Sequence, residues 1–131
     1  MAENIVIGEF GEDIATDYLR DAGFRILKRN YKLGSIGEID IICRDIDGTL
    51  VFVEVKSGVS FSEDIKPEHH FNKEKEWRVR RLAENFANSH PNYVSKKLGF
   101  RIDLVTVSFS EKGGSPNSNL KDWTIRHYKN F

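Results

Sequence analysis

The chain of 131 residues has little cysteine, little proline and no excess charge of either sign. Its one cysteine, Cys43, has no disulfide partner and stands in an apolar run, which is typical of a packing residue in a reducing compartment. Lysine plus arginine number 20 and aspartate plus glutamate number 20, so bulk charge does not drive binding to nucleic acid or to an acidic membrane. Any contact with a polyanion must therefore be local.

Other absences narrow the class of protein further. No stretch of about twenty apolar residues is present and no basic segment precedes the short apolar run near the N-terminus, so we expect a cytoplasmic protein that does not enter a membrane. No glycine-rich phosphate loop, zinc-type Cys/His spacing or internal repeat is found. No serine or cysteine has a histidine positioned to activate it. The length fits one domain, residues 1–131.

The hydrophobic pattern predicts an alternation of helices and strands. Apolar residues at spacings of three and four predict helices over residues 7–22 and 73–89. Runs of apolar and β-branched residues predict strands over residues 24–31, 37–44, 50–56, 100–109 and 123–128. A strand that follows a helix can lie parallel to its neighbour. We therefore expect an α/β fold with a mixed central sheet of about five strands, flanked by helices in the order αβββαβ(β).

The centre of the chain is a predicted β-hairpin whose strands are suited to burial except at Asp40, Glu54 and Lys56. A charge in such a strand costs several kcal/mol unless it is paired or binds a metal. A wholly apolar face requires a three-residue turn, with Gly48 in the left-handed bulge position. That register places Asp40 across from Glu54 on the second face and Ile39 on the apolar face.

The polar residues of the hairpin suggest a metal site. Two facing carboxylates, Asp40 and Glu54, offer the oxygen ligands that Mg²⁺ or Mn²⁺ prefers, and the backbone carbonyl of Val55 adds a neutral ligand. Lys56 can position a water molecule or neutralise charge on a phosphate. The same residues, together with Glu38, would also fit a surface salt-bridge cluster. Spacing alone leaves both interpretations open.

Three further groups have two interpretations each. Glu12 borders the buried stripe of the first helix, so it is either a flanking surface acid or a fourth site residue. The second helix has a basic face that includes Lys73, Lys75 and Arg78, which is typical of a solvated face or of phosphate contacts. For His69-His70 we favour a solvated loop over a metal site, because adjacent side chains on an extended segment diverge.

The motifs of the chain resemble those of a known family. They are Gly37-Glu-Ile-Asp-Ile-Ile and Val51-Phe-Val-Glu-Val-Lys56, with Gly8-Glu-x-Gly-Glu12-x-x-Ala15-x-x-Tyr-Leu19, Ile26-Leu-x-Arg-Asn30 and Arg101-Ile-Asp103-Leu-Val105. This combination resembles the YraN family of bacterial endonuclease-like proteins. The resemblance implies a restriction-endonuclease-like fold with a nuclease site at Asp40, Glu54 and Lys56. In the similar archaeal Holliday-junction resolvases a helix adds one acid, which here would be Glu12.

The sequence and the resemblance together predict a Mg²⁺- or Mn²⁺-dependent endonuclease acting on nucleic acid, with branched or single-stranded DNA as the expected substrate. Asp40 and Glu54 would hold the metal, Glu12 would assist through water or a second ion, and Lys56 would position the nucleophile. Junction resolvases act as dimers because they make paired cuts, so a homodimer is one expectation. The alternative is a nucleic-acid-binding or protein-interaction module that retains the fold without catalysis.

Overall fold

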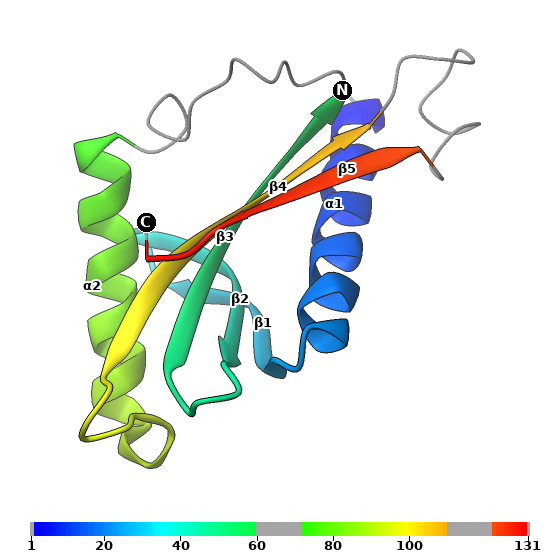
Figure 1. The fold of residues 1–131 in the computed structure, drawn as a ribbon. Coiled ribbons are helices and arrows are strands. Elements are labelled where there is room, and N and C mark those ends of the chain that lie inside the picture. Colours follow the sequence, from blue (N-terminus) through cyan, green and yellow to red (C-terminus); the bar gives the residue numbers. More distant parts are fainter. Residues whose placement is uncertain (1, 60–71, 110–121, 131) are drawn as a thin grey trace.

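The computed structural model describes residues 2–59, 72–109 and 122–130. In chain order the elements are α1 (Ala2–Asp21), β1 (Arg25–Leu33), β2 (Gly37–Arg44), β3 (Leu50–Val59), α2 (Lys73–Ser89), the 3-10 turn η2 (Pro91–Tyr93), β4 (Phe100–Phe109) and β5 (Trp123–Tyr128). The strands form one mixed sheet in the order β1-β2-β3-β4-β5, in which only the β3–β4 pair is parallel. One helix packs on each face (Figure 1). The predicted α/β fold and its element order are confirmed.

The predicted elements differ from the observed ones mainly at their ends. The first helix begins at Ala2, earlier than its apolar stripe, and β3 continues through Ser57-Gly58 to Val59, a stretch expected to be loop. Residues 54–59 stay extended because each pairs with parallel β4, and this pairing outweighs the weak strand preference of serine and glycine. His69-His70 lie outside the described residues. Within the described part of the chain, no helix has the length and apolar character needed to cross a membrane.

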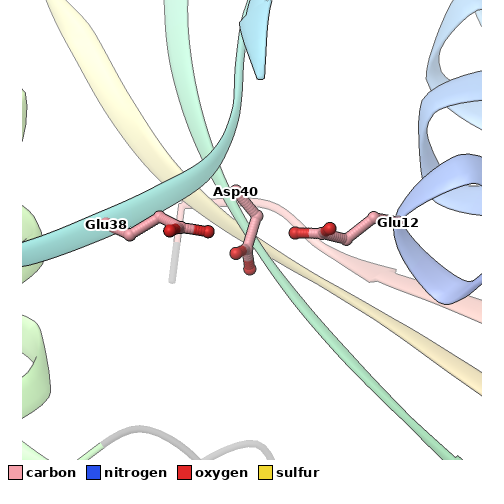
Figure 2. A group of neighbouring side chains, drawn as sticks. All are labelled: Glu12, Glu38 and Asp40. Atoms are coloured by element: carbon pink, nitrogen blue, oxygen red, sulfur yellow. The ribbon is translucent and has the colours of Figure 1, made fainter. Parts of the chain in front are cut away.

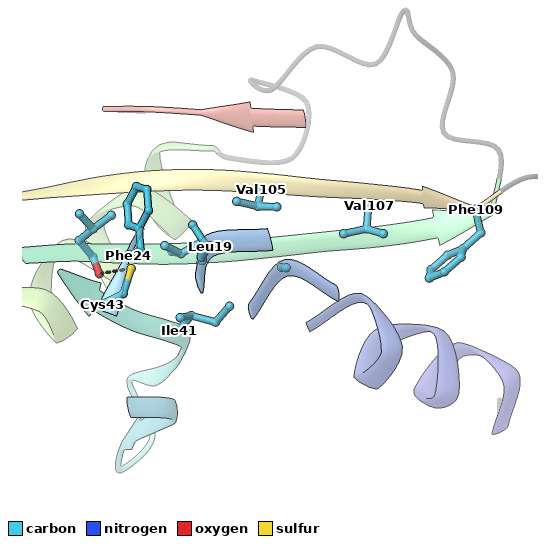
Figure 3. Close-up of a cluster of buried hydrophobic side chains, with 10 residues drawn as sticks. Leu19, Phe24, Ile41, Cys43, Val105, Val107 and Phe109 are labelled. Atoms are coloured by element: carbon cyan, nitrogen blue, oxygen red, sulfur yellow. Dashed lines mark hydrogen bonds between the residues drawn. The ribbon is translucent and has the colours of Figure 1, made fainter. Parts of the chain in front are cut away.

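The first hydrophobic cluster lies between α1 and the sheet (Figure 3). Ala15 and Leu19 of the helix pack against a layer that includes Ile41 and Cys43 of β2. The thiol of Cys43 is buried and donates a weak hydrogen bond to the Val51 carbonyl at 3.7 Å. Burial, together with nearby acidic charge, raises the pKa of Cys43 to about 12. The thiol is therefore protonated and unreactive, in agreement with the predicted packing role.

The second cluster lies between α2 and the opposite face of the sheet. The buried residues of α2 are Val79, Leu82, Ala83 and Phe86, which form a stripe at helical spacing. They cover Ile42, Leu50 and Phe52, and the rings of Phe52 and Phe86 meet edge to face at 5.8 Å. The helix begins where the Asn72 side chain accepts a hydrogen bond from the Lys75 N–H at 2.8 Å. Both faces of the sheet are thus covered, and the positions of both helices relative to it are fixed.

The turn of the β2–β3 hairpin has the predicted three-residue form. The Asp45 N–H donates to the Thr49 carbonyl and the Gly48 N–H donates to the Asp45 carbonyl, both at 2.9 Å. Gly48 has a φ of 93°, the left-handed conformation that this bulged turn requires. The Asp47 carboxylate accepts from the Thr49 N–H at 2.9 Å. This turn fixes the register of the two strands that carry the site.

A buried aspartate, for which the sequence predicted no role, links β4 to β5 and to the residues that follow β5. Asp103 of β4 is fully buried and accepts hydrogen bonds from Arg101 (3.0 and 3.2 Å), His127 Nε2 (2.8 Å) and the Asn130 N–H (2.9 Å). Arg101 also reaches Asp45 in the hairpin turn at 2.6 Å. Burial alone would raise the pKa of Asp103, but its hydrogen bonds, first those from His127 and Arg101, outweigh this effect and hold the pKa below its ordinary value.

Replacing Asp103 by Asn should therefore lower the free energy of unfolding by about 3 kcal/mol at pH 7, because Arg101 then loses a buried ionic partner. A carboxyl with a lowered pKa in the folded state contributes stability above its unfolded pKa of about 3.9 and loses it at lower pH. The difference between wild type and D103N should thus narrow below about pH 4 in urea unfolding experiments. D17N is the control, since Asp17 is 75% exposed. If D103N lost as little free energy of unfolding as D17N, the stabilising role of Asp103 would be contradicted.

Candidate metal centre

The candidate site lies where β2 and β3 separate. Their ladder pairs Arg44 with Leu50, Cys43 with Val51, Ile42 with Phe52 and Ile41 with Val53, which confirms the predicted register. It ends at the last of these pairs. Beyond it, β2 pairs only with β1, and residues 54–59 of β3 pair only with β4. We call this separation of the two strands the fork.

The Asp40 side chain replaces the strand partner that Val55 lacks at the fork. Asp40 Oδ2 accepts a hydrogen bond from the Val55 N–H at 2.8 Å. The expected backbone pair between Asp40 and Glu54 is therefore not formed, and a carboxylate satisfies the backbone donor instead. Because the N–H and C=O of one extended residue point to the same edge, the Val55 carbonyl also faces the fork. Asp40 and the predicted carbonyl ligand thus lie on the same side of β3.

A change of face within β2 corrects a second expectation. Ile39 was predicted to share the apolar face of Ile41, but Ile41 packs in the α1 cluster whereas Ile39 packs in the α2 cluster. The regular alternation is broken around Asp40. On the neighbouring strand Asn30 has a φ of 54°, between the pairs Arg29–Ile41 and Tyr31–Ile39. The left-handed residue and the end of the β3 ladder let β2 bend, which turns Asp40 toward α1.

Three carboxylates from two elements meet at this bend. Glu12 of α1 and Glu38 of β2 point toward Asp40 from opposite sides (Figure 2), and one oxygen from each lies within 4.8 Å of the others. With its amide nitrogen turned toward the acids, Asn30 donates to Glu12 Oε1 at 3.2 Å and to Glu38 Oε1 at 2.9 Å. Lys32 of β1 forms an ion pair with Glu38, with 3.6 Å between Lys32 Nζ and Glu38 Oε2. The structure therefore brings Glu12 into the site.

Close packing of α1 on β3 places Glu12 at the fork. A Cβ atom at Gly11 would collide with the side chain of Ser57, so the glycine permits the helix to approach the strand. Arg29 of β1 pairs with Asp13 at 2.9 Å and anchors the same turn of the helix. Periodicity alone could not show this contact, because it depends on how closely the helix lies against the sheet.

Glu54 lies on the other side of the fork and contacts a residue of α2. Its side chain is 8% exposed, and Lys75 Nζ is 3.4 Å from Glu54 Oε2. Lys75 was predicted as a nucleic-acid contact and here pairs with a predicted metal ligand. Lys56 is exposed, and no ion pair joins it to an acid among the described residues. The lysine that contacts Glu54 thus comes from α2, while the exposed Lys73 and Arg78 extend the basic face.

The acids hold more charge than their surroundings can stabilise. Burial, followed by the hydrogen bond and charge of Asp40, raises the pKa of Glu12 to about 7. Burial and then the charge of Asp40 raise the pKa of Glu54 to about 7, although Lys75 acts in the opposite direction. Burial also raises the pKa of Asp40, against the hydrogen bonds from Val55 and Glu12. At neutral pH the cluster therefore keeps protons that a cation can displace.

Two residues of the site were not among those predicted to act in it. Glu38 was expected on the same hairpin face as Asp40, Glu54 and Lys56 but was given no role in the site, although its position two residues before Asp40 was a usable signal. Asn30 stood in a motif without an assigned role. Asparagine tolerates the left-handed conformation better than most residues, but no pattern in the sequence revealed that it would be required there.

Comparison with known proteins agrees with the resemblance seen in the motifs. Residues 11–107 match the family model described as uncharacterised protein family UPF0102, which is the YraN family. The chain is 34% identical over 124 residues to a UPF0102 protein of Desulforamulus reducens, covering 95% of this chain and 93% of that one. It is 38% identical over 116 residues to a UPF0102 protein of Syntrophus aciditrophicus, covering 86% and 84%. The chain therefore belongs to the UPF0102 family.

Proposed function

We propose that the protein is a divalent-metal-dependent nuclease whose active site is the fork between β2 and β3. One observation carries this proposal: one carboxylate oxygen each of Glu12, Glu38 and Asp40 lies within 4.8 Å of the others, and the buried Glu54 is close enough to Asp40 for the charge of Asp40 to raise its pKa. Acids that serve only solubility do not gather in this way, because their mutual repulsion and desolvation destabilise the fold. A bound cation would remove that repulsion.

The residues at the fork fit Mg²⁺ or Mn²⁺ by the chemistry of their donor atoms. Carboxylate oxygens and a backbone carbonyl are hard ligands suited to these ions. Asp40, Glu54 and the carbonyl of Val55 would hold the metal, and Glu12 and Glu38 stand close enough to Asp40 to bind through water or to a second ion. Burial, followed by the interaction with Asp40, raises the pKa values of Glu12 and Glu54 to about 7, and a bound cation would counter the second of these effects.

The chain's own groups provide the remaining chemistry of phosphodiester hydrolysis. When bound, the metal would stabilise charge on the phosphate and lower the pKa of a coordinated water. Glu12 lies beside Asp40, where its carboxylate would accept a proton from the attacking water. Lys75 is partly exposed at the rim of the fork, so its ammonium group can serve both Glu54 and an approaching phosphate. Lys56 extends from the same strand as Glu54 toward solvent.

The family resemblance supports the same reaction. It implies a restriction-endonuclease-like fold with the motif Asp40, Glu54 and Lys56, and the observed sheet order and fork accommodate that motif. Nucleic acid, DNA in particular, is the substrate we propose. The alternative hypothesis is a binding module that has the same fold but no catalytic activity, and the experiments below distinguish it from the nuclease.

Metal binding should depend on Asp40. Isothermal titration with Mn²⁺ is expected to show binding to the wild type and a loss of affinity of at least about tenfold in D40N, because a ligand charge is removed. The amide of Asn can still accept the Val55 hydrogen bond, so the fold is retained. E9Q, an exposed neighbour of Glu12 on α1, is the matched control and should bind like the wild type. Equal Mn²⁺ affinity in D40N and wild type would exclude a metal at the fork.

Mn²⁺ affinity should also rise with pH. Protons on Glu12 and Glu54 compete with the cation below their pKa of about 7, so affinity should increase between pH 6 and 8 by roughly tenfold for each group that must ionise. Above that range it should level off. Titrations in buffers of different ionisation enthalpy measure the released protons directly. Affinity that stays constant from pH 6 to 8, with no proton release, would contradict the account of the two acids.

Catalysis is tested with labelled single-stranded, duplex and four-way-junction DNA in the presence of Mg²⁺ or Mn²⁺. We expect cleavage of at least one substrate, reduced about a hundredfold or more in E54Q and D40N because charge stabilisation at the phosphate is lost. E9Q should cleave like the wild type. If the wild type binds DNA and Mn²⁺ but cuts nothing, the non-catalytic module is the better description.

A further inference from the structure

Three cations on α2 form a row that leads away from the fork. Lys75, Arg78 and Arg81 are spaced by three residues, which makes them neighbours on the helix surface with Cβ atoms about 5–6 Å apart. At about 100° per residue the row winds from the side of the helix that faces the sheet to its outer side. Lys75 contacts Glu54 at the start of this row, while Arg78 and Arg81 are exposed.

The row ends at an exposed aromatic side chain. Trp77 is 58% exposed, and Arg81 Cζ lies 5.2 Å from the centre of its ring. Trp77 is two residues from the buried Val79, about 160° around the helix, so its ring faces away from the hydrophobic cluster. An indole paired with a guanidinium on an open surface offers a stacking platform for a nucleobase.

A hollow of about 200 Å³ adjoins this platform. It is lined by Leu33 at the end of β1, by Ile36 of the β1–β2 connection and by Arg81, Glu84, Asn85 and Asn88 of α2. Asn85 is held in place because its Oδ1 accepts a hydrogen bond from the Tyr31 hydroxyl at 2.8 Å. The lining thus combines apolar walls with donors and acceptors, the types of group that recognise the edge of an exposed base.

We propose that the outer flank of α2 binds unpaired nucleotides of the substrate. This surface consists of the row Lys75, Arg78 and Arg81, the ring of Trp77 and the adjoining hollow. This inference rests on the proposed nuclease function and names the substrate class as nucleic acid with an unpaired stretch beside the cleaved phosphate. The backbone would follow Lys75, Arg78 and Arg81, and a base would stack on Trp77. Six residues of helix span about 9 Å, which corresponds to two or three nucleotides at about 3.4 Å each.

The charges of α2 favour this occupant over an acidic membrane. Glu74, Glu76 and Glu84 alternate with the cations, so the helix does not present the unbroken basic surface that anionic lipids attract. A single strand needs only a narrow cationic track with an aromatic ring beside it. Inside a fully paired duplex each base is stacked on both faces, so its interior bases have no free face to offer to Trp77.

The test compares the binding of blunt duplex DNA with that of duplexes carrying overhangs of one, two, three and five nucleotides, in EDTA so that no cleavage occurs. Fluorescence anisotropy should show that the affinity for DNA rises by about tenfold or more from the blunt duplex to the duplex with a three-nucleotide overhang. A five-nucleotide overhang should add little to this affinity. W77A and R81A should lose most of this gain, and W77F should retain part of it. R80A, a neighbouring arginine that pairs with Glu76 instead, and W123A are the matched controls and should bind like wild type.

Two further readouts separate the possible results. R78A should reduce the salt dependence of binding by about 0.7 in log affinity per log salt, the contribution of one phosphate on a single strand. In W123F, which keeps Trp77 as its one tryptophan, the overhang should quench fluorescence. Equal affinity for blunt and overhanging DNA, or W77A indistinguishable from R80A, would overturn the inference even if Mn²⁺ binds normally. Absence of Mn²⁺ binding would overturn the proposed nuclease function. The affinities for the series of overhangs would still decide whether Trp77 binds an unpaired base.

Discussion

The hydrogen bond between the Val55 N–H and the Asp40 carboxylate is the interaction on which the candidate site depends. Where β2 leaves β3, a backbone donor loses its strand partner, and a buried donor left without an acceptor costs about 1–3 kcal/mol. Asp40 supplies the acceptor and is thereby fixed between Glu12 and Glu38. The same side chain completes the sheet and positions the acids, so the fold and the proposed chemistry share one requirement.

The two aspartates of the sheet strands, Asp103 and Asp40, differ in the groups that surround them. Asp103 is surrounded by donors from Arg101, His127 and Asn130, and its pKa is lowered. Asp40 lies among other acids, and burial, followed by the weaker effect of the charge of Glu38, raises its pKa. The first arrangement stabilises the folded chain, whereas the second destabilises it, and the proposed cation would relieve that destabilisation. Sites that carry such unrelieved charge are frequent where proteins bind ligands.

Much of this arrangement could be predicted from the sequence because local rules determine it. The hairpin register follows from the apolar pattern and from Gly48, and the helices follow from their stripes. The fork could not be predicted, since it depends on where β2 stops pairing with β3. Local rules also could not predict the left-handed backbone of Asn30, the placement of Ile39 or the Lys75–Glu54 contact, because each depends on tertiary packing. The resemblance to nucleases identified Glu12, which periodicity alone left ambiguous.

The central claim is that the fork holds a divalent cation between Asp40 and Glu54. Crystals of the protein soaked in Mn²⁺ test it most directly, because manganese scatters anomalously and its position can be seen without assumption about ligands. The account predicts an anomalous peak within bonding distance of about 2.0–2.3 Å from oxygens of Asp40 and Glu54, with Lys75 displaced from Glu54. A soaked crystal with an accessible fork but no peak there, or with Mn²⁺ bound only at surface acids elsewhere, would contradict it.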